Sequence, residues 1–242
     1  MYRNLQLWAL KTSDYVVRFT ESSVIALEKY YGLAIRDKQI VGVYVSREFE
    51  DASHGVDHHQ TTGNSTKPAQ LLWVGRLVPS KNVDFLLRAA ALLRSKSWQL
   101  NICSDGPERT RLEMLASRLN LSSRTRFLGA VDDLAAYYRD ADLFLTASLL
   151  EQYSLTIMEA YSFGVPCIGI RPDWKSSFNS NEDQIVDGKT GYLVTDEREM
   201  AERIDYLLDN PDLRREFSIN ARQMKSSISF ESYYQKLKAV LS

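Results

Sequence analysis

The chain has 242 residues, of which 44% are hydrophobic and 25% are charged, and this composition is typical of a globular protein rather than a disordered one. Thirty basic and 31 acidic side chains leave a net charge of -1, which argues against a general nucleic-acid-binding protein because such proteins carry a basic excess. A chain of this length can fold without disulfides or a structural metal. We therefore expect Cys103 and Cys167, which lie in apolar runs, to be buried free thiols.

The sequence also bears on where the protein resides. No segment approaches the roughly 18 apolar residues of a transmembrane helix. The apolar segment near the N-terminus is too short for a signal peptide and lacks a cleavage site of small residues. We expect a cytoplasmic protein, either in solution or peripheral at the inner face of the membrane.

Residues 13–45 have the pattern of a strand–helix–strand unit. The runs YVVRFT and IVGVYV are the predicted strands, and the predicted helix extends from Glu21 to Tyr31. Residues 46–69 then form a polar stretch without periodicity, and such a stretch is unusual inside a compact domain. We therefore expect a domain boundary here, with residues 1–45 on one side and residues 46–69 as a linker.

The predicted linker contains His54, His58 and His59, which raises the hypothesis of a metal site. Metal sites in proteins usually combine two clusters of ligating residues, and no second cluster accompanies these histidines. We interpret them as part of a polar loop and expect no metal.

From residue 70 onward, short apolar runs alternate with amphipathic helical patterns. The runs are mostly continuous, which favours strands that are buried on both faces of a parallel sheet. One helical face is formed by Val83, Leu86, Leu87, Ala90 and Leu93. This alternation predicts an α/β fold with a Rossmann-like, doubly wound parallel sheet over residues 70–224, followed by a C-terminal helix over residues 225–242. The predicted strands are QLLWVG, WQLNICS, RTRFLG, DLFLTAS, PCIGIR and GYLV.

Polar residues follow these strands at the edge where a ligand would bind. In an open α/β sheet, that edge lies at the carboxyl ends of the strands. It is predicted to carry glycines, two cations and carboxylates, which suit a polyanionic ligand with hydroxyl groups. The residues are Gly75, Arg76 and Lys81 after the first strand, Val131 and Asp133 after the third, and Glu151, Ser154, Leu155 and Glu159 after the fourth.

These residues belong to motifs that occur in a characteristic order. Glu151 and Glu159 form an E-x7-E element, which is followed by a Gly164-Val-Pro166 turn and later by DGKTGYLV. The sequence from about residue 70 to 224 resembles the C-terminal domain of retaining glycosyltransferases of family 4 (group 1). The resemblance implies the C-terminal half of a GT-B fold, in which two Rossmann-like domains enclose the active site.

The resemblance also extends, more weakly, to the N-terminal part of the chain. Residues 13–45 resemble the end of the N-terminal GT-B domain. The resemblance thus implies that residues 1–45 are a remnant of that domain, and that residues 70–224 bind the nucleotide-sugar donor.

The resemblance implies a diphosphate site at the start of the donor domain. Arg76 and Lys81, which follow Gly75, resemble the pair that binds the diphosphate, with the arginine as a planar fork of donors and the lysine as a mobile charge. The alternative is a solvated loop with two surface cations. Ser154, where the family usually has glycine, and Leu155 open a helix, so their backbone N–H groups can face the diphosphate.

The two glutamates are assigned different roles by the same resemblance. Glu159 is expected to accept hydrogen bonds from the ribose hydroxyls, and Glu151 to contact the donor sugar near the reacting carbon. A glycosidase acid/base pair is one alternative. Eight helical residues span about 12 Å, whereas glycosidase carboxylates lie about 5 to 9.5 Å apart, but Glu151 lies just before the helix, so the spacing weakens this alternative and leaves it open. The other alternative is that both are solvent-facing carboxylates. With Glu151 we count Arg76 and Lys81 as catalytic, because the two cations offset the charge of the leaving group.

The loop from Val131 to Asp133 resembles the one that contacts the base of the donor, through the backbone of Val131 and the carboxylate of Asp133. The alternative for Asp133 is a helix N-cap, a role that aspartate often has. Ser104 to Pro107, where the family usually begins with glycine, has the alternative of a plain turn and cap.

The resemblance implies transfer of a hexose from a nucleoside diphosphate sugar to an acceptor saccharide or lipid-linked sugar. Retention of configuration, a role in polysaccharide or glycolipid synthesis, and independence of metal and cofactor follow from it. A complete family member has a larger N-terminal domain with the acceptor site, so the chain is expected to be either a truncated portion or a natural short form. The alternative function is a non-catalytic nucleotide-sugar-binding module, or a subunit completed by a partner chain that supplies the N-terminal domain.

Overall fold

The computed structural model describes residues 16–18, 39–41, 67–95, 97–173 and 175–226, together with residues 231, 234, 235, 238 and 239. Strands β1 (Val16–Arg18) and β2 (Gln39–Val41) pair in parallel. The first lies within the predicted strand YVVRFT, and the second overlaps the start of the predicted strand IVGVYV. The helix predicted from Glu21 to Tyr31, nearly all of the predicted linker and most of the predicted C-terminal helix lie outside the described residues.

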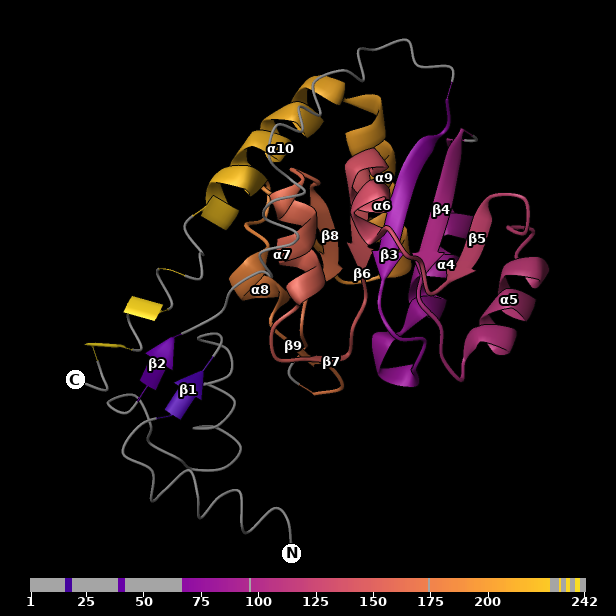
Figure 1. Cartoon of the computed structure of the whole chain (residues 1–242). Coiled ribbons are helices and arrows are strands. Elements are labelled where there is room, and N and C mark those ends of the chain that lie inside the picture. Colours follow the sequence, from indigo (N-terminus) through magenta and orange to yellow (C-terminus); the bar gives the residue numbers. More distant parts are fainter. Residues whose placement is uncertain are drawn as a thin grey trace, which may run out of the picture.

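A parallel sheet of six strands forms the centre of the described structure (Figure 1). All six predicted strands are confirmed, and the apolar residues of the inner strands are buried between helices on both faces, whereas the edge strand β5 is partly exposed. The strand order is β10-β8-β6-β3-β4-β5. The strands are β3 (Ala69–Val74), β4 (Trp98–Cys103), β5 (Thr125–Gly129), β6 (Leu143–Thr146), β8 (Cys167–Ile170) and β10 (Gly191–Val194).

The strand order reverses its direction once. From β3 the chain builds outward through β4 to β5, and it then returns to place β6 on the other side of β3. In doubly wound sheets such a switch point, at the carboxyl ends of the strands, is where ligands bind. The loops that follow β3 and β6 are therefore the first place to look for a site.

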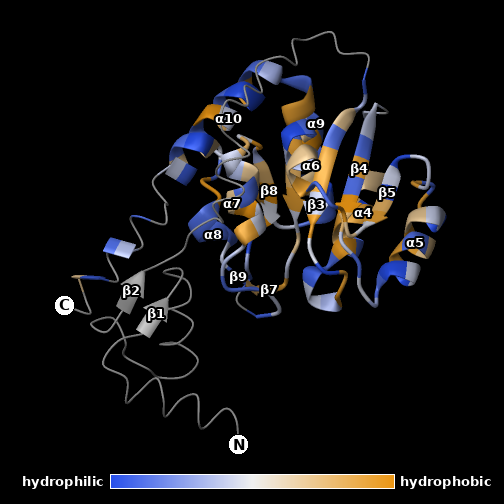
Figure 2. Ribbon diagram, in the orientation of Figure 1, coloured by the Kyte–Doolittle hydropathy of each residue, from blue (hydrophilic) through white to orange (hydrophobic). Residues whose placement is uncertain are grey.

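Helices cover both faces of the sheet, as the doubly wound prediction requires. One core packs the strands against α4 (Val83–Ala91), α5 (Arg109–Arg118) and α9 (Glu197–Asp209). The other core packs them against α6 (Leu134–Asp140) and α7 (Leu155–Ser162), and α10 (Pro211–Ser226) contributes to both. In Figure 2 the middle of the sheet is apolar, whereas much of α10 is hydrophilic.

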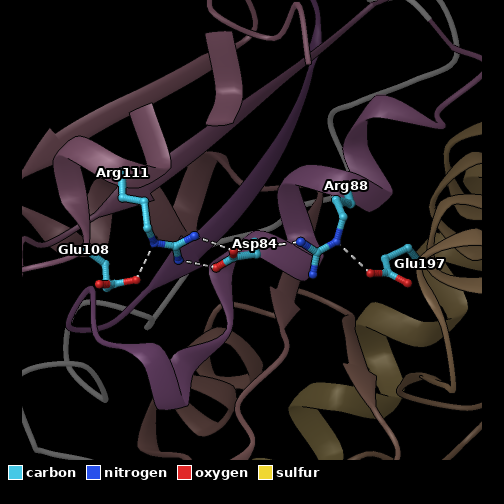
Figure 3. A network of polar contacts seen from close by, with 5 residues as sticks. All are labelled: Asp84, Arg88, Glu108, Arg111 and Glu197. Atoms are coloured by element: carbon cyan, nitrogen blue, oxygen red, sulfur yellow. Dashed lines mark hydrogen bonds and ion pairs between the residues drawn. The ribbon is translucent and has the colours of Figure 1, made fainter. Parts of the chain in front are cut away.

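Ion pairs connect the three helices of the first face on their outer side (Figure 3). Both carboxylate oxygens of Asp84 on α4 accept hydrogen bonds from Arg111 on α5, at 2.6 and 2.7 Å. Glu108 also pairs with Arg111, and Arg88 joins Asp84 to Glu197 at the start of α9. The hydrogen bonds from Arg111 hold the pKa of Asp84 below its usual range. We call these five residues the outer ion-pair network.

Two expectations about the whole chain can be compared with the structure. Cys103 and Cys167 are buried free thiols, as predicted, and burial raises the pKa of Cys103 to about 12. The described helices include none with the length and apolar character that crossing a membrane requires.

Candidate active site

The loop after β3 places the two predicted phosphate-binding cations. Gly75 and Leu77 donate backbone hydrogen bonds to Cys103, at the end of β4, and to Asp105 in the loop that follows, at 3.2 and 2.9 Å, and these bonds fix the start of the loop after β3. Arg76 is exposed, and its guanidinium forms no hydrogen bond or ion pair with any described residue. Lys81 ends the short 3-10 helix η3 (Pro79–Lys81).

Lys81 forms an ion pair with Glu151, which the sequence places 70 residues later. The backbone N–H of Leu149 also donates to the carbonyl of Ser80, at 2.7 Å, so the loops after β3 and β6 are joined. About a quarter of the Lys81 side chain and a fifth of the Glu151 side chain are exposed, at 26% and 19%. The structure therefore brings together, at the switch point, a cation and a carboxylate that the sequence assigned to the same ligand.

Glu151 belongs to a small two-stranded sheet that fixes its backbone. Strand β7 (Leu150–Glu151) pairs in parallel with β9 (Phe178–Asn179), and both lie at the lower edge of the central sheet in Figure 1. The carbonyl of Glu151 accepts a hydrogen bond from Ser180, at 3.1 Å, and the buried Asn179 amide donates to the carbonyl of Ser148. The backbone of Glu151 is thus fixed by residues that follow it by almost 30 positions.

The backbone of Ser154 is bound on both sides by one side chain. Gln184, at the end of α8 (Asn181–Gln184), accepts a hydrogen bond from the Ser154 N–H and donates one to the Ser154 carbonyl, both at 2.8 Å. We call this arrangement the Gln184 clamp. It differs from the expectation that the Ser154 N–H faces a diphosphate, because that donor is already used. Leu155, half exposed, is the first residue of α7, and its N–H belongs to the first turn, where backbone donors have no partner within the helix.

Glu159 lies one turn into α7 and is partly buried. The hydroxyl of Tyr138, on α6, donates a hydrogen bond of 2.8 Å to Oε2 of Glu159. Burial raises the pKa of Glu159, and the hydrogen bond from Tyr138 opposes this effect because it stabilises the charged form. The carboxylate is therefore anchored at one oxygen.

The loop between β5 and α6 contains the two residues predicted to contact the base. Oδ1 of the exposed Asp133 accepts a hydrogen bond of 3.0 Å from the N–H of Ala136, so Asp133 is the N-cap of α6. The N-cap role given as the alternative is therefore present, and the contact of the Asp133 carboxylate with a base stays a prediction. Val131 packs at the edge of the second core, and its contact with a base stays a prediction.

The turn from Ser104 to Pro107 has a structural role. Ser104 has a φ of 101°, in the region that favours glycine, which agrees with the glycine that the family usually has here. A Cβ on Gly106 would lie 2.3 Å from the carbonyl oxygen of Leu77, so only glycine fits. The Asp105 carboxylate accepts a hydrogen bond from the Gly106 N–H and forms an ion pair with Arg109. These contacts confirm the turn interpretation.

Two residues of the site escaped prediction from the sequence. Tyr138 belongs to the pair Tyr137-Tyr138 in an amphipathic helix. A tyrosine in such a position is most simply interpreted as a core residue, and Tyr138 does belong to the second core. Gln184 lies in no recognised motif, and its contact with Ser154 spans 30 positions. Neither side chain leaves a signal in local spacing.

The structure offers no candidate metal centre among the residues it describes, since no group of three or more His, Cys, Asp or Glu side chains converges there. His54, His58 and His59 lie outside those residues, and so their interpretation as a polar loop stays a prediction.

Comparison with known proteins gives a consistent result. Residues 57–224 match the model of the glycosyl transferases group 1 family. An uncharacterized glycosyltransferase of Haemophilus influenzae is 29% identical over 178 residues, which cover 71% of this chain and 48% of the relative. D-inositol 3-phosphate glycosyltransferase 2 of Catenulispora acidiphila is 33% identical over 67% of this chain and 40% of its own length. The chain thus spans about half the length of these relatives, or less.

The fold is also found in a solved protein structure. Anabaena HepE, crystallised with UDP and glucose, superposes with a TM-score of 0.79 over 99% of this chain at 19% identity, and 66% of its own length is covered. The parallel sheet described above is accordingly the Rossmann-like sheet of GT-B enzymes. The family match covers well over half of the residues. The chain therefore belongs to the group 1 glycosyltransferases.

Proposed function

We propose that this chain is the donor-binding part of a retaining glycosyltransferase that transfers a hexose from a nucleoside diphosphate sugar to an acceptor saccharide or lipid-linked sugar. One observation carries the proposal: the contact between Lys81 and Glu151 joins the loops after β3 and β6 at the switch point of the sheet. That position is where α/β sheets bind nucleotides. The UDP and glucose bound by Anabaena HepE support the same class of donor.

The diphosphate has a suitable set of partners at this point. Arg76 is exposed and its guanidinium is unpaired within the described residues. Lys81 can bind a phosphate oxygen by giving up its ion pair with Glu151. The first turn of α7 adds N–H donors and the positive end of the helix dipole. These groups offset the charge of the diphosphate, and so we propose that neither a metal ion nor a cofactor takes part.

Binding of the donor would change the partner of Lys81. The phosphate oxygens compete with Glu151 for the ammonium group, and the released carboxylate can then turn toward the sugar. When the bond between the anomeric carbon and the phosphate oxygen breaks, its electron pair leaves with the diphosphate and positive charge develops on the sugar. Glu151 stabilises that positive charge, while Arg76 and Lys81 stabilise the leaving group.

The acceptor site is proposed to come from a further domain. The relatives that match are about twice as long as the aligned part of this chain. A second GT-B domain, on the same polypeptide or on a partner chain, would supply the acceptor wall of the cleft. We expect the 242-residue chain to bind the donor without transferring the sugar.

Calorimetry with UDP, GDP and ADP tests the proposal. We expect one of them to bind with high micromolar to millimolar affinity, about -4 to -6 kcal/mol, and the result would identify the base. Arg76→Ala combined with Lys81→Ala is the matched control, since it removes both cations and no core residue. Absence of heat with all three nucleotides would contradict the proposal.

A further inference from the structure

The hydrogen bond between Tyr138 and Glu159 connects two helices of the same face, α6 and α7. Tyr138 is fully buried, with its ring stacked on Phe163 and tilted against Phe144, at centroid distances of 5.9 Å in both cases. A ring enclosed in this way has few alternative rotamers. Its hydroxyl is therefore a fixed donor to the carboxylate of the partly buried Glu159.

The kind of donor matters for what Glu159 can still bind. No cation within the described residues forms an ion pair with Glu159, and its contact with Tyr138 uses only Oε2. A carboxylate has about four acceptor positions on its two oxygens. A neutral hydroxyl occupies one of them and leaves the charge unneutralised, so Oε1 stays a strong acceptor for hydroxyl groups of a ligand.

We infer that Tyr138 is a positioning residue for the ribose of the donor: it holds Oε2 so that Oε1 of Glu159 meets the ribose hydroxyls. The inference rests on the proposed function, in which Glu159 binds the ribose. Helix α6 starts directly after the Val131 to Asp133 loop that is predicted to contact the base. The same hydrogen bond thus sets the distance between the ribose carboxylate and that loop.

Discrimination between a ribose and its dideoxy analogue tests this inference. The affinities of the 242-residue chain for UDP and for 2′,3′-dideoxy-UDP are measured by calorimetry, or for the GDP or ADP pair if that base binds better. We expect the parent to prefer the ribose about tenfold, the effect of hydrogen bonds to a charged group. In Tyr138→Phe the preference should fall to about two- or threefold, with affinity for the dideoxy ligand unchanged.

Tyr161→Phe is the matched control. Tyr161 is also fully buried, lies on α7, and uses its hydroxyl for a 2.7 Å contact with Thr190 instead of Glu159. Tyr161→Phe removes a tyrosine hydroxyl from the same core as Tyr138→Phe does, and it should keep the full ribose preference. If Tyr138→Phe does not fold, Tyr138→4-fluorophenylalanine fills the volume of the hydroxyl without donating, and the same loss of preference is expected.

The outcomes separate this inference from the proposed function. A Tyr138→Phe variant that keeps the tenfold preference, or that weakens both ligands equally, overturns the positioning role. A parent chain that binds both ligands equally overturns it as well, and leaves the diphosphate site intact. A parent chain that binds neither ligand overturns the proposed function, and the inference with it.

Discussion

The outer ion-pair network and the site at the switch point both combine arginine with carboxylates, but they differ in how the charged groups are paired. In the network every charge is matched: Asp84 has its two oxygens bonded by Arg111, and Arg88 pairs with Glu197 (Figure 3). At the site, the guanidinium of Arg76 has no partner among the described residues. A set of matched charges fixes helices, whereas an unmatched cation beside a replaceable pair is ready for an anionic ligand. The comparison predicts that equivalent substitutions in the two regions have different effects.

The largest difference should appear at the two kinds of carboxylate. In an enzyme completed by its acceptor domain, Glu151→Gln should lower kcat about 100-fold or more, because an electrostatic contact aimed at the transition state is lost. The donor KM should change little. Glu159→Gln should mainly raise the donor KM, because ribose contacts are alike in the ground and transition states. Steady-state kinetics at varied donor concentration measures both constants.

Glu197→Gln is the control from the outer network, and its kcat and KM should equal those of the parent. The same kinetic signature for Glu151→Gln and Glu159→Gln would contradict the division of roles. Product analysis by NMR adds a second check, since an inverted anomeric configuration would contradict the retaining mechanism.

The next largest effect concerns the phosphate-binding cations. Arg76→Ala or Lys81→Ala should weaken UDP binding by about 1.5 to 3 kcal/mol, the range for hydrogen bonds to charged groups. Binding of uridine, which lacks phosphates, should hardly change, and a chelator should have no effect on either variant or parent. Arg88→Ala, which removes an arginine of the outer network, serves as the control in calorimetry. Variants at both positions that bind UDP like the parent would show that the diphosphate lies elsewhere.

The smallest effect should come from breaking the network itself. Because Arg111 lowers the pKa of Asp84, the ionised carboxylate stabilises the fold above its unfolded pKa of about 3.9, and this contribution is lost as the pH falls through the lower folded-state pKa. Asp84→Asn should therefore reduce the free energy of unfolding at pH 7, by about 1 kcal/mol, because the pairs lie at the surface and are partly exposed.

Urea unfolding at a series of pH values measures the effect of Asp84→Asn. The difference from the parent should close only as the pH falls through the lowered folded-state pKa of Asp84, because the carboxylate is then protonated in both states. UDP binding at pH 7 should be unaffected. A difference that persists in acid would mean that the variant acts through packing instead of charge.

The six strands were predictable because each is a short, mostly apolar run between helical patterns, as is typical of strands in a parallel sheet covered on both faces. Strands β7 and β9 were not predicted. Each has two residues, too few for any periodicity, and they form only because the loops after β6 and β8 meet in space.

The site was predictable only as a set of residue types at one edge of the sheet. The sequence placed Lys81 and Glu151 on the same edge, and the structure adds an ion pair between them that the sequence did not predict. The occupied N–H of Ser154 and the anchored oxygen of Glu159 depend on Gln184 and Tyr138, whose side chains arrive from other elements. Such contacts follow from the tertiary packing, and no single segment of sequence specifies them.

The Gln184 clamp has a consequence for exchanging parts between related enzymes. The Gln184 amide binds both the N–H and the carbonyl of Ser154, as a neighbouring strand would in a sheet. The segments around Ser154 and Gln184 should therefore be exchanged together, although 30 positions separate the two residues. A chimera that imports the Glu151 to Glu159 segment alone would meet a foreign side chain at position 184 and lose the geometry of the donor site. Transplanting residues 148–159 together with residues 177–185 should keep both hydrogen bonds of the clamp in the chimera.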